Sequence, residues 1–286
     1  MRPSRTSWVH ETPASGHSPT HSLPSDEQPC AKGASMIPLL APLFQGEWAD
    51  YGETLACAPQ WPTGAISIVQ LSNDDVLLGH ILRRYATHLG VTGNDLRAAA
   101  SAWSLDYLWA LLPPVAAAAS VLQHSFPMHA GDVAVSLNDV GAPIRFHIIH
   151  EGHPMPGSPT GARYDALLEK HLEPLFKAIS RQTRLAPKIL WGNTARYLEA
   201  IFDQALELTG HAEHVATDRE MLLQKPIRRN GHPNPLYGRQ RNSVRIEDGV
   251  ATTITLHRQC CLFYRLPGQS YCGACPLAPE HRRATG

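Results

Sequence analysis

The sequence predicts an α+β protein with a mostly helical body, a central β-hairpin or small antiparallel sheet, and a small C-terminal module that contains cysteines. Three observations lead to this prediction. Several long segments place apolar residues at helical spacing, and one mid-chain stretch alternates apolar and polar residues as a hairpin does. Four of the six cysteines lie within residues 260–275, after the helical part of the chain has ended.

The composition is that of an ordinary globular protein and excludes several classes. The chain has 286 residues, of which 43% are hydrophobic and 17% charged, and its formal net charge is +0. A neutral chain has no long-range field that would attract nucleic acid or an anionic membrane. Six cysteines are too few for a disulfide-dense secreted scaffold, and the first residues contain no apolar signal segment. We therefore expect a soluble cytoplasmic protein whose thiols stay reduced or bind metal.

Residues 1–35 differ from everything that follows them. They are rich in Pro, Ser, Thr and His and contain almost no aliphatic residues, so they cannot bury enough apolar surface to offset the entropy lost on ordering. We predict a disordered tail, and the abrupt rise in apolar content at Met36 suggests a mis-called start. Cys30 lies in this tail and is not expected to have a role. The α+β body is expected to occupy residues 36–225.

The first half of the body is predicted to be helical. A helix is expected over residues 72–90, between an N-capping residue and a terminal glycine. A second helix starts near Asn94 and leads into the apolar run over residues 108–122. This run is shorter than the ~20 residues of a membrane span. Its Pro113–Pro114 pair predicts a kink or break, with a further helix after the prolines.

The second half of the body begins with a predicted hairpin. Residues 132–150 have alternating apolar residues on both sides of the turn "NDVGAP". Two amphipathic helices follow, with apolar stripes over residues 167–179 and 198–208. A loop is predicted over residues 225–245, and a strand over 250–257 is expected to deliver the chain into the cysteine segment.

The C-terminal module, residues 226–286, contains four cysteines with the spacing C-C-x10-C-x2-C, namely Cys260, Cys261, Cys272 and Cys275. Structural zinc usually takes four thiolates from two short turns, but side chains that are adjacent in an extended chain point to opposite sides. A [2Fe–2S] cluster is wider than one ion and binds four thiolates on two irons, so it accommodates adjacent cysteines more readily. Disulfide or catalytic thiol chemistry is disfavoured. From the residues alone the cluster leads and zinc remains the alternative.

The stretch "RQCCLFYRLPGQSYCGACPL", residues 258–277, resembles the C-terminal signature of the FhuF-like ferric-siderophore reductases. The similarity includes the intervening "YRLPG", "YCG" and "CPL", and the body segments "MIPLLAPLF" and "LWGN" are similar in outline. The resemblance implies that the four cysteines ligate a [2Fe–2S] cluster, which would make the C-terminal module an iron–sulfur module. One departure is Gln269, where the family often has a second glycine, and no ligand position is altered.

The resemblance also implies a function. One-electron reduction converts tightly chelated Fe(III) into weakly held Fe(II), and a [2Fe–2S] centre is a one-electron carrier. The expected protein is a cytoplasmic ferric-siderophore reductase that accepts electrons from an unidentified donor and makes at most a peripheral contact with the inner membrane or a siderophore importer. The alternative is a zinc-stapled or cluster-bearing siderophore-binding or electron-carrier protein without reductase turnover.

The loop over residues 225–245 contains six basic residues and no acid, which predicts a local positive patch. Arg228 and Arg229 are the candidates for contact with an anionic chelate, because the planar fork of arginine suits carboxylates. The candidates for tuning the potential of the cluster are Arg258, Arg265 and the amides of Gly273 and Ala274.

Overall fold

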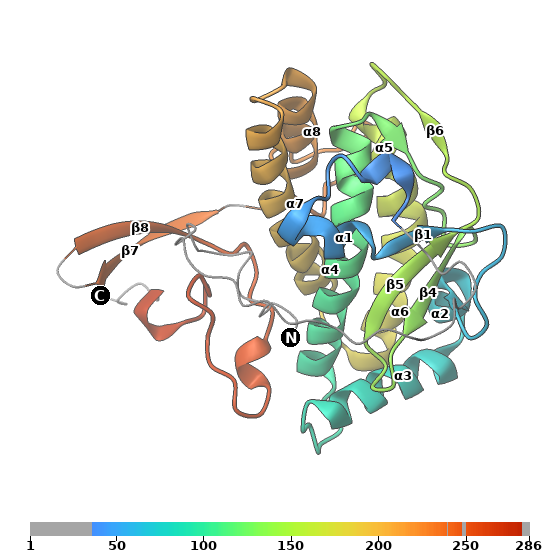
Figure 1. The fold of residues 1–286 in the computed structure, drawn as a ribbon. Helices are drawn as coiled ribbons and strands as arrows, with labels where there is room; N and C mark the ends of the chain where they lie inside the picture. Colours follow the sequence, from blue (N-terminus) through green and yellow to red (C-terminus); the bar gives the residue numbers. More distant parts are fainter. Residues whose placement is uncertain (1–35, 239, 248–249, 282–286) are drawn as a thin grey trace, which may run out of the picture.

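The computed structural model describes residues 36–238, 240–247 and 250–281. The predicted tail, residues 1–35, lies outside the described residues together with Cys30. A helical body with a small sheet at one side forms most of the molecule, and the C-terminal segment extends from the opposite side (Figure 1).

The order of helices and strands agrees with the predicted α+β class. The helices are α1 (Ala49–Gly52), α2 (Ile68–Asn73), α3 (Asp75–His88), α4 (Arg97–Ser120), α5 (Thr160–Leu167), α6 (Glu173–Thr183), α7 (Pro187–Leu208) and α8 (Glu213–Leu223). The strands are β1 (Leu55–Cys57), β2 (Ile66–Ser67), β3 (His124–Ser125), β4 (Val133–Leu137), β5 (Pro143–Ile148), β6 (His153–Pro154), β7 (Arg241–Glu247) and β8 (Val250–Leu256). A π-helical turn, Leu168–Leu172, joins α5 to α6. The predicted class is confirmed.

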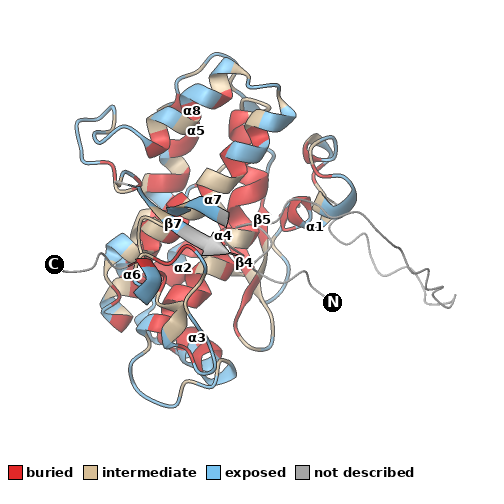
Figure 2. Ribbon diagram, turned by 90° about the vertical axis from the view of Figure 1, so that its left-hand side faces the viewer, coloured by how far each residue is buried: buried red, intermediate tan, exposed pale blue. Residues whose placement is uncertain are grey.

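Helix α4 forms the centre of the body. Nearly all of its 24 residues are buried (Figure 2), as expected of a helix that is apolar on every side. It continues through Pro113 and Pro114 as one helix, so the predicted break with a second helix after the prolines is wrong. An interior proline removes a backbone hydrogen bond and costs about 3 kcal/mol. Both prolines are buried, and the apolar contacts around α4 offset that loss.

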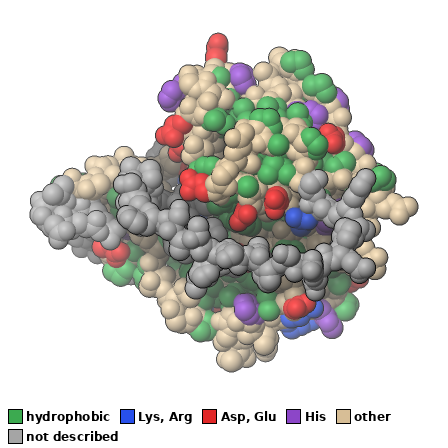
Figure 3. Space-filling model, in the orientation of Figure 1, with side chains coloured by type: hydrophobic (Ala, Val, Ile, Leu, Met, Phe, Trp, Pro, Cys, Tyr) green, Lys and Arg blue, Asp and Glu red, His purple; other side chains and the backbone are tan. Residues whose placement is uncertain are grey.

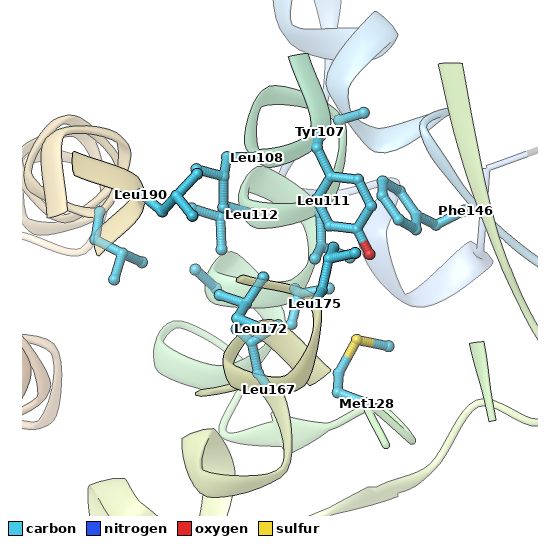
Figure 4. Packing of buried hydrophobic residues seen from close by; sticks show 14 of the residues in the cluster. Tyr107, Leu108, Leu111, Leu112, Met128, Phe146, Leu167, Leu172, Leu175 and Leu190 are labelled. Atoms are coloured by element: carbon cyan, nitrogen blue, oxygen red, sulfur yellow. The ribbon is translucent and has the colours of Figure 1, made fainter. Parts of the chain in front are cut away.

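The core lies where α4 meets β5, α7 and the segment from α5 to α6 (Figure 4). Leu108 and Leu112 of α4 lie toward Leu190 of α7. On another side of α4, Tyr107 packs edge-to-face against Phe146 of β5, with ring centroids 4.8 Å apart. Fully burying such side chains contributes roughly 1.5–3 kcal/mol each. These contacts hold α7 against α4. Helix α7 is also the helix that contacts the cysteine-containing part of the C-terminal module, called the cysteine module from here on.

The predicted mid-chain hairpin is confirmed as β4 and β5, which pair antiparallel with Val135 opposite Phe146. The complete sheet has the strand order β1-β5-β4-β2. Strand β1 runs parallel to β5, so the sheet is mixed; β1 has only three residues and shows no alternating pattern in the sequence. The indole of Trp103 in α4 donates a hydrogen bond to the carbonyl of Gly141 in the hairpin turn (2.8 Å), which ties the hairpin to the central helix.

The remaining predicted helices are present with shifted ends. The helix expected over residues 72–90 is α3, and its N-cap is Asp74, whose carboxylate accepts a hydrogen bond from the amide of Leu77 (2.9 Å). The stripe predicted over residues 167–179 is buried and spans α5, the π turn and α6. The stripe over residues 198–208 lies on α7 and is buried except at its last residue.

A second hairpin, β7 and β8, precedes the cysteines and extends away from the body (Figure 1). The predicted strand over residues 250–257 is confirmed as β8. The predicted loop over residues 225–245 ends earlier than expected, because β7 begins at Arg241 and pairs with β8 from there. Pairing with β8 gives these residues strand geometry that their own polar sequence does not indicate.

The surface agrees with a neutral chain. On the face shown in Figure 3, acidic, basic and histidine side chains appear among hydrophobic ones. Among the described residues, no helix combines the length and the apolar character needed to cross a bilayer.

Candidate metal centre

The four cysteines of the C-terminal module lie together as two pairs of thiols. The Sγ atoms of Cys260 and Cys275 are 3.5 Å apart. The thiols of Cys261 and Cys272 share a hydrogen bond. Cys272 is partly exposed, and the other three cysteines are buried. Each member of the adjacent pair therefore meets a different member of the C-x2-C turn.

The chain turns sharply directly after the adjacent pair. Leu262 has a φ of +61°, a conformation that is uncommon for a residue with a side chain. Its amide donates a hydrogen bond to the Sγ of Cys260 (3.3 Å). The amide of Phe263 donates to the sulfur of Cys261. Both sulfurs thus receive backbone N–H donors, which favour the thiolate form.

The C-x2-C turn is held by the β7–β8 hairpin. The amide of His257, which directly follows β8, donates to the carbonyl of Ala274 (2.9 Å). His281 contacts the carbonyl of Gly273 through Nε2 (3.0 Å) and the hydroxyl of Ser243 in β7 through Nδ1 (3.1 Å). The hairpin therefore holds in place the turn that contains Cys272 and Cys275.

The loop between the two cysteine pairs closes on itself. Tyr264 and Tyr271 stack with ring centroids 4.3 Å apart and planes at 19°. Gly268 has a φ of +69° and supplies the left-handed turn between them. Gln269, where the sequence departs from the family pattern, does not adopt a positive φ. This position therefore does not require a glycine.

The same loop anchors the cysteines to the body. Leu266 is part of the main hydrophobic core, and Leu262 and Phe263 pack against that core while partly buried. Arg265 pairs with Asp95, which precedes α4, at 3.2 Å. The module is thus bound to the body by apolar contacts and also by the ion pair of Arg265 with Asp95, which forms its charged edge.

One face of α7 receives the residues that flank the adjacent cysteines. Gly192, Arg196 and Glu199 are spaced by four and three residues, so they lie on one side of the helix. A Cβ added at Gly192 would lie 2.6 Å from the Cβ of Gln259, so glycine alone permits this close approach. The carboxylate of Glu199 accepts a hydrogen bond from Nε of Arg258 (2.7 Å). The module is therefore docked on α7 immediately before Cys260.

Arg196 is a residue that the cysteine motif does not reveal. Its guanidinium hydrogen-bonds the thiol of Cys261 and acts on Cys272 through its charge. No spacing rule links a helix residue of the body to cysteines at the other end of the chain. Its position one helical turn after the "LWGN" segment was the only signal in the sequence.

Each residue of that segment has a distinct role. Leu190 is in the core, and Trp191 lines a cavity between α6, α7 and the basic loop. Gly192 admits the cysteine module. The side-chain amide of Asn193 is buried and donates to the hydroxyl of Ser104 in α4 (3.0 Å). Together these contacts fix the rotation of α7, and so the direction in which Arg196 points.

The thiols are electrostatically unequal. Burial raises the pKa of Cys260 to about 12. The hydrogen bond from Cys272, together with the charge of Arg196, lowers the pKa of Cys261 to about 5. Because Cys272 donates that hydrogen bond, its pKa is raised well above the ordinary value. The surroundings of Cys261 thus favour its thiolate, the ionisation state in which sulfur binds metal.

The residues that were predicted to tune the potential make other contacts. Arg258 pairs with Glu199, and Arg265 pairs with Asp95. Gly273 and Ala274 accept hydrogen bonds from His281 and His257 through their carbonyls, and the role of their amides stays a prediction.

The basic loop of residues 225–245 meets acids from other elements. Arg228 pairs with Glu169 of the π turn (3.0 Å), and Lys225 pairs with Glu220 of α8 (2.5 Å). Arg229 is exposed. The loop has no acid of its own, but folding brings carboxylates to it, so the patch is less positive than its sequence indicates.

A cavity of about 550 Å³ lies where this loop meets α6 and α7. Trp191 and Phe176 form an apolar wall, with ring centroids 5.0 Å apart. Cζ of Arg228 lies 5.9 Å from the centroid of the Trp191 ring. The other lining residues are Glu169, Glu173, Lys177, Pro187, Asn230, His232, Pro233 and Pro235.

Comparison with known families identifies the domain that contains the four cysteines. The family described as ferric iron reductase FhuF-like transporter matches residues 101–251, and the FhuF 2Fe-2S C-terminal domain matches residues 258–277. The chain belongs to the FhuF family. It therefore contains a [2Fe–2S] cluster, and the matched C-terminal domain includes all four clustered cysteines.

The chain is 23% identical over 222 residues to the ferric siderophore reductase of Escherichia coli (strain K12), covering 76% of this chain and 80% of that protein. Two structures of the aerobactin synthetase IucA from a hypervirulent pathotype of Klebsiella pneumoniae, one of them with ATP bound, align at 17% identity with a TM-score of 0.46. The first alignment covers 61% of this chain and 38% of that chain, so the match spans well under half of the synthetase.

The donor set suits the cofactor of the family. Four thiolates are the ligands that a [2Fe–2S] cluster takes, and the structure brings four thiols together as two neighbouring pairs. In the part of the chain that the structure describes, no three His, Cys, Asp or Glu side chains are grouped as a single-ion site requires.

Proposed function

We propose that this chain is a ferric-siderophore reductase, which reduces the Fe(III) of a siderophore complex by one electron and so releases iron as Fe(II) in the cytoplasm. Membership of the FhuF family and the Escherichia coli relative support this activity. Hard anionic oxygens hold Fe(III) tightly. Fe(II) has less charge, and the same oxygens attract it less strongly, so it leaves more readily.

The observation that carries the proposal is the pairing of Cys260 with Cys275 and of Cys261 with Cys272. These four residues would hold the cluster as thiolates. When bound, the cluster supplies one-electron transfer at a potential set by its charge, its hydrogen bonds and its exposure to solvent.

The chain's own residues perform the remaining tasks. The amides of Leu262 and Phe263 supply hydrogen-bond donors at the sulfurs of the adjacent pair. Burial of three of the four thiols keeps water away from them. Cys272 is the most exposed of the four, so a chelate or an electron donor can approach from its side.

We place the ferric chelate in the cavity beside α6 and α7. Its volume of about 550 Å³ lies in the range of small-molecule sites. Arg228 lines it, and after pairing with Glu169 it keeps a buried Nε that has no hydrogen-bond partner within the described residues. Arg229 is exposed nearby in the chain and would attract an anionic chelate from solution. Trp191 of the cavity wall precedes Gly192, on which the cysteine module docks.

The remaining partners are also part of the proposal. A one-electron donor must return the protein to its reduced form after each turnover. A peripheral contact with the inner membrane, or with a siderophore importer, would deliver the chelate without a spanning segment. The neutral composition and the free thiols favour a reducing compartment such as the cytoplasm.

The decisive experiment uses the protein purified without oxygen. The expected sample is red-brown and bleaches with dithionite. Mixing the reduced sample with a ferric siderophore should restore the colour while Fe(II) appears in a chelating trap. Cys261→Ser should lose the visible spectrum, whereas Cys57→Ser, at the end of β1, should keep it.

Three other outcomes would each contradict one part of the proposal. A colourless protein with one zinc per chain would identify a zinc-stapled binding protein. A coloured protein that no ferric chelate reoxidises would be an electron carrier or sensor. A full visible spectrum in Cys261→Ser would show that the ligand set is wrong.

The substrate cavity has a separate test. Arg228→Ala should raise the KM for a ferric siderophore several-fold and leave reoxidation by ferricyanide unchanged, because ferricyanide needs no cavity. Arg229→Ala, a matched change of an exposed arginine, should have the smaller effect. Equal KM values for wild type and Arg228→Ala would place the chelate elsewhere.

A further inference from the structure

Arg196 is a buried cation on the face of α7 that receives the cysteine module. Its guanidinium hydrogen-bonds the thiol of Cys261. Its Nε and Nη2 atoms are buried, and neither has a hydrogen-bond partner among the residues that the structure describes. Buried donors of a charged group are costly unless something anionic accepts from them.

The nearest acids along α7 do not neutralise this charge. Glu199 accepts from Arg258 at 2.7 Å, and Asp203 pairs with Arg219 at 2.9 Å. Within the described chain, no ion pair between Arg196 and a carboxylate is found. The group that Arg196 does face is the pair of Cys261 and Cys272, which becomes anionic when the cluster is in place.

We propose that Arg196 is a positioning residue that places a buried positive charge and N–H donors beside the Cys261–Cys272 side of the cluster and raises its reduction potential. The inference rests on the presence of the cluster and on the proposed four-cysteine ligand set. Reduction adds one negative charge to the site, and a fixed positive charge stabilises the more negative form by the larger amount.

The body of the protein therefore controls the potential of its C-terminal module. Arg196 belongs to α7, whose rotation is fixed by Leu190 in the core and by the bond from Asn193 to Ser104. Gly192, four residues earlier, brings the module into contact with the same face. A module that leaves α7 loses this charge, so docking and potential are coupled.

The test measures the midpoint potential of the purified holoprotein by a dye-mediated redox titration followed in visible light. Arg196→Gln should shift the equilibrium toward the oxidised cluster by tenfold or more, which is about 59 mV for one electron. Arg196→Lys keeps the charge and should stay within threefold of wild type. The control Arg181→Gln removes an exposed arginine that pairs with Asp75, and it should leave the potential unchanged.

The dependence on salt distinguishes the effect of a buried charge on the potential from the effect of exposed charges. The shift in Arg196→Gln should persist at 1 M salt, where exposed charges are screened within about 3 Å. An unchanged potential in Arg196→Gln, or equal shifts in Arg196→Gln and Arg181→Gln, would overturn the proposal. Because the titration needs no siderophore, it decides this point whether or not the protein reduces ferric chelates.

Loss of the cluster in the variant is also informative. If Arg196→Gln is folded by circular dichroism but colourless while Arg196→Lys is coloured, the positive charge is required to hold the cluster, which supports the contact. If both variants are folded and colourless, the shape of arginine matters rather than its charge, and the proposal fails.

Discussion

Two arginines of this chain, Arg163 and Arg196, bind very different partners. Nη2 of Arg163 donates to both carboxylate oxygens of Asp218, at 2.6 and 2.7 Å, and both side chains are almost fully buried. The hydroxyls of Ser120 and Thr160 complete the carboxylate's contacts, at 2.7 and 2.6 Å. Arg196 instead faces thiols and pairs with no carboxylate in the described chain, where two of its buried donors, and one of Arg163, have no partner.

The difference separates a structural site from a functional one. The pair of Arg163 and Asp218 is neutral, and it joins α5 and α8 to the end of α4. Such a pair stabilises one arrangement of the helices and leaves no unbalanced charge for a ligand, although Nε of Arg163 has no partner among the described residues. Arg196 has charge and donors in excess, which is useful only where an anionic group is bound. Changes at the first site should alter stability, and changes at the second should alter the cluster.

The largest expected effect is at the pair of Arg163 and Asp218. Asp218→Ala leaves the charge of Arg163 buried and unpaired, so the free energy of unfolding should fall by about 3–5 kcal/mol. Urea unfolding followed by circular dichroism measures this loss. Asp203→Ala removes an exposed partner of Arg219 and should cost less than about 1 kcal/mol. If the folded fraction of Asp218→Ala had a changed midpoint potential, the site of Arg163 and Asp218 would also affect the cluster, and the distinction between the two sites would fail.

The body should also respond to acid through His171, a buried histidine that contacts the hydroxyl of Tyr107 (2.5 Å). Burial lowers the pKa of His171 to about 3. Between this value and about 6.5, the unfolded chain binds a proton that the folded chain does not, so stability falls as the pH falls. The expected slope in this window approaches about 1.4 kcal/mol per pH unit.

Urea midpoints between pH 7.5 and 5.5 test this expectation. The His171→Gln variant should be less stable at neutral pH but should show a shallower decline with acid. His80→Gln, a change of an exposed histidine in α3, should keep the slope of wild type. Equal slopes in wild type and His171→Gln would show that another group controls the acid response.

A smaller effect is expected at the docking face. Gly192→Ala places a Cβ 2.6 Å from Gln259, and overpacking of this kind costs about 1–3 kcal/mol. The module should loosen, so the cluster should bleach faster in air while the far-ultraviolet spectrum changes little. Gly79→Ala in α3 meets only the ends of flexible side chains and should be neutral or slightly stabilising. Bleaching at the wild-type rate in Gly192→Ala would contradict a tight interface at this point.

The smallest effect is expected at the charged edge of the module. Arg265 and Asp95 pair at 3.2 Å while both remain exposed, and Arg97 also pairs with Asp95. Asp95→Asn should therefore change cluster stability by less than about 1 kcal/mol. The bleaching rate in low and high salt measures this. A loss as large as that of Gly192→Ala would mean that the edge, rather than the α7 face, holds the module.

Local patterns in the sequence predicted the helices α3, α4, α6 and α7 and the strands β4, β5 and β8, but not α8 or the short strands β2, β3 and β6. The hairpin of β4 and β5 followed from alternation around a turn, and the buried stripe through α5 and α6 followed from helical spacing. The break at Pro113 was wrong because a local rule for proline does not include the packing around α4. β1 and β7 were missed because each exists through its pairing with another strand.

The candidate site divides in the same way. The four cysteines and their family resemblance are local and were evident in residues 258–277. Their pairing was not, since it depends on the turn at Leu262 and on the hairpin that holds the C-x2-C turn. The sequence of the basic loop contains no acid to pair with its arginines. In the structure, however, Arg228 pairs with Glu169, which comes from a distant turn.

The sequence by itself determined the class of fold, the family and the cysteines, because each of these depends on residue types at short, fixed separations. Only the tertiary structure decided which thiol meets which, and that Arg196 lies beside two of them. Those contacts join segments far apart in the chain, and they form because the core fixes the rotation of α7, on which the module docks.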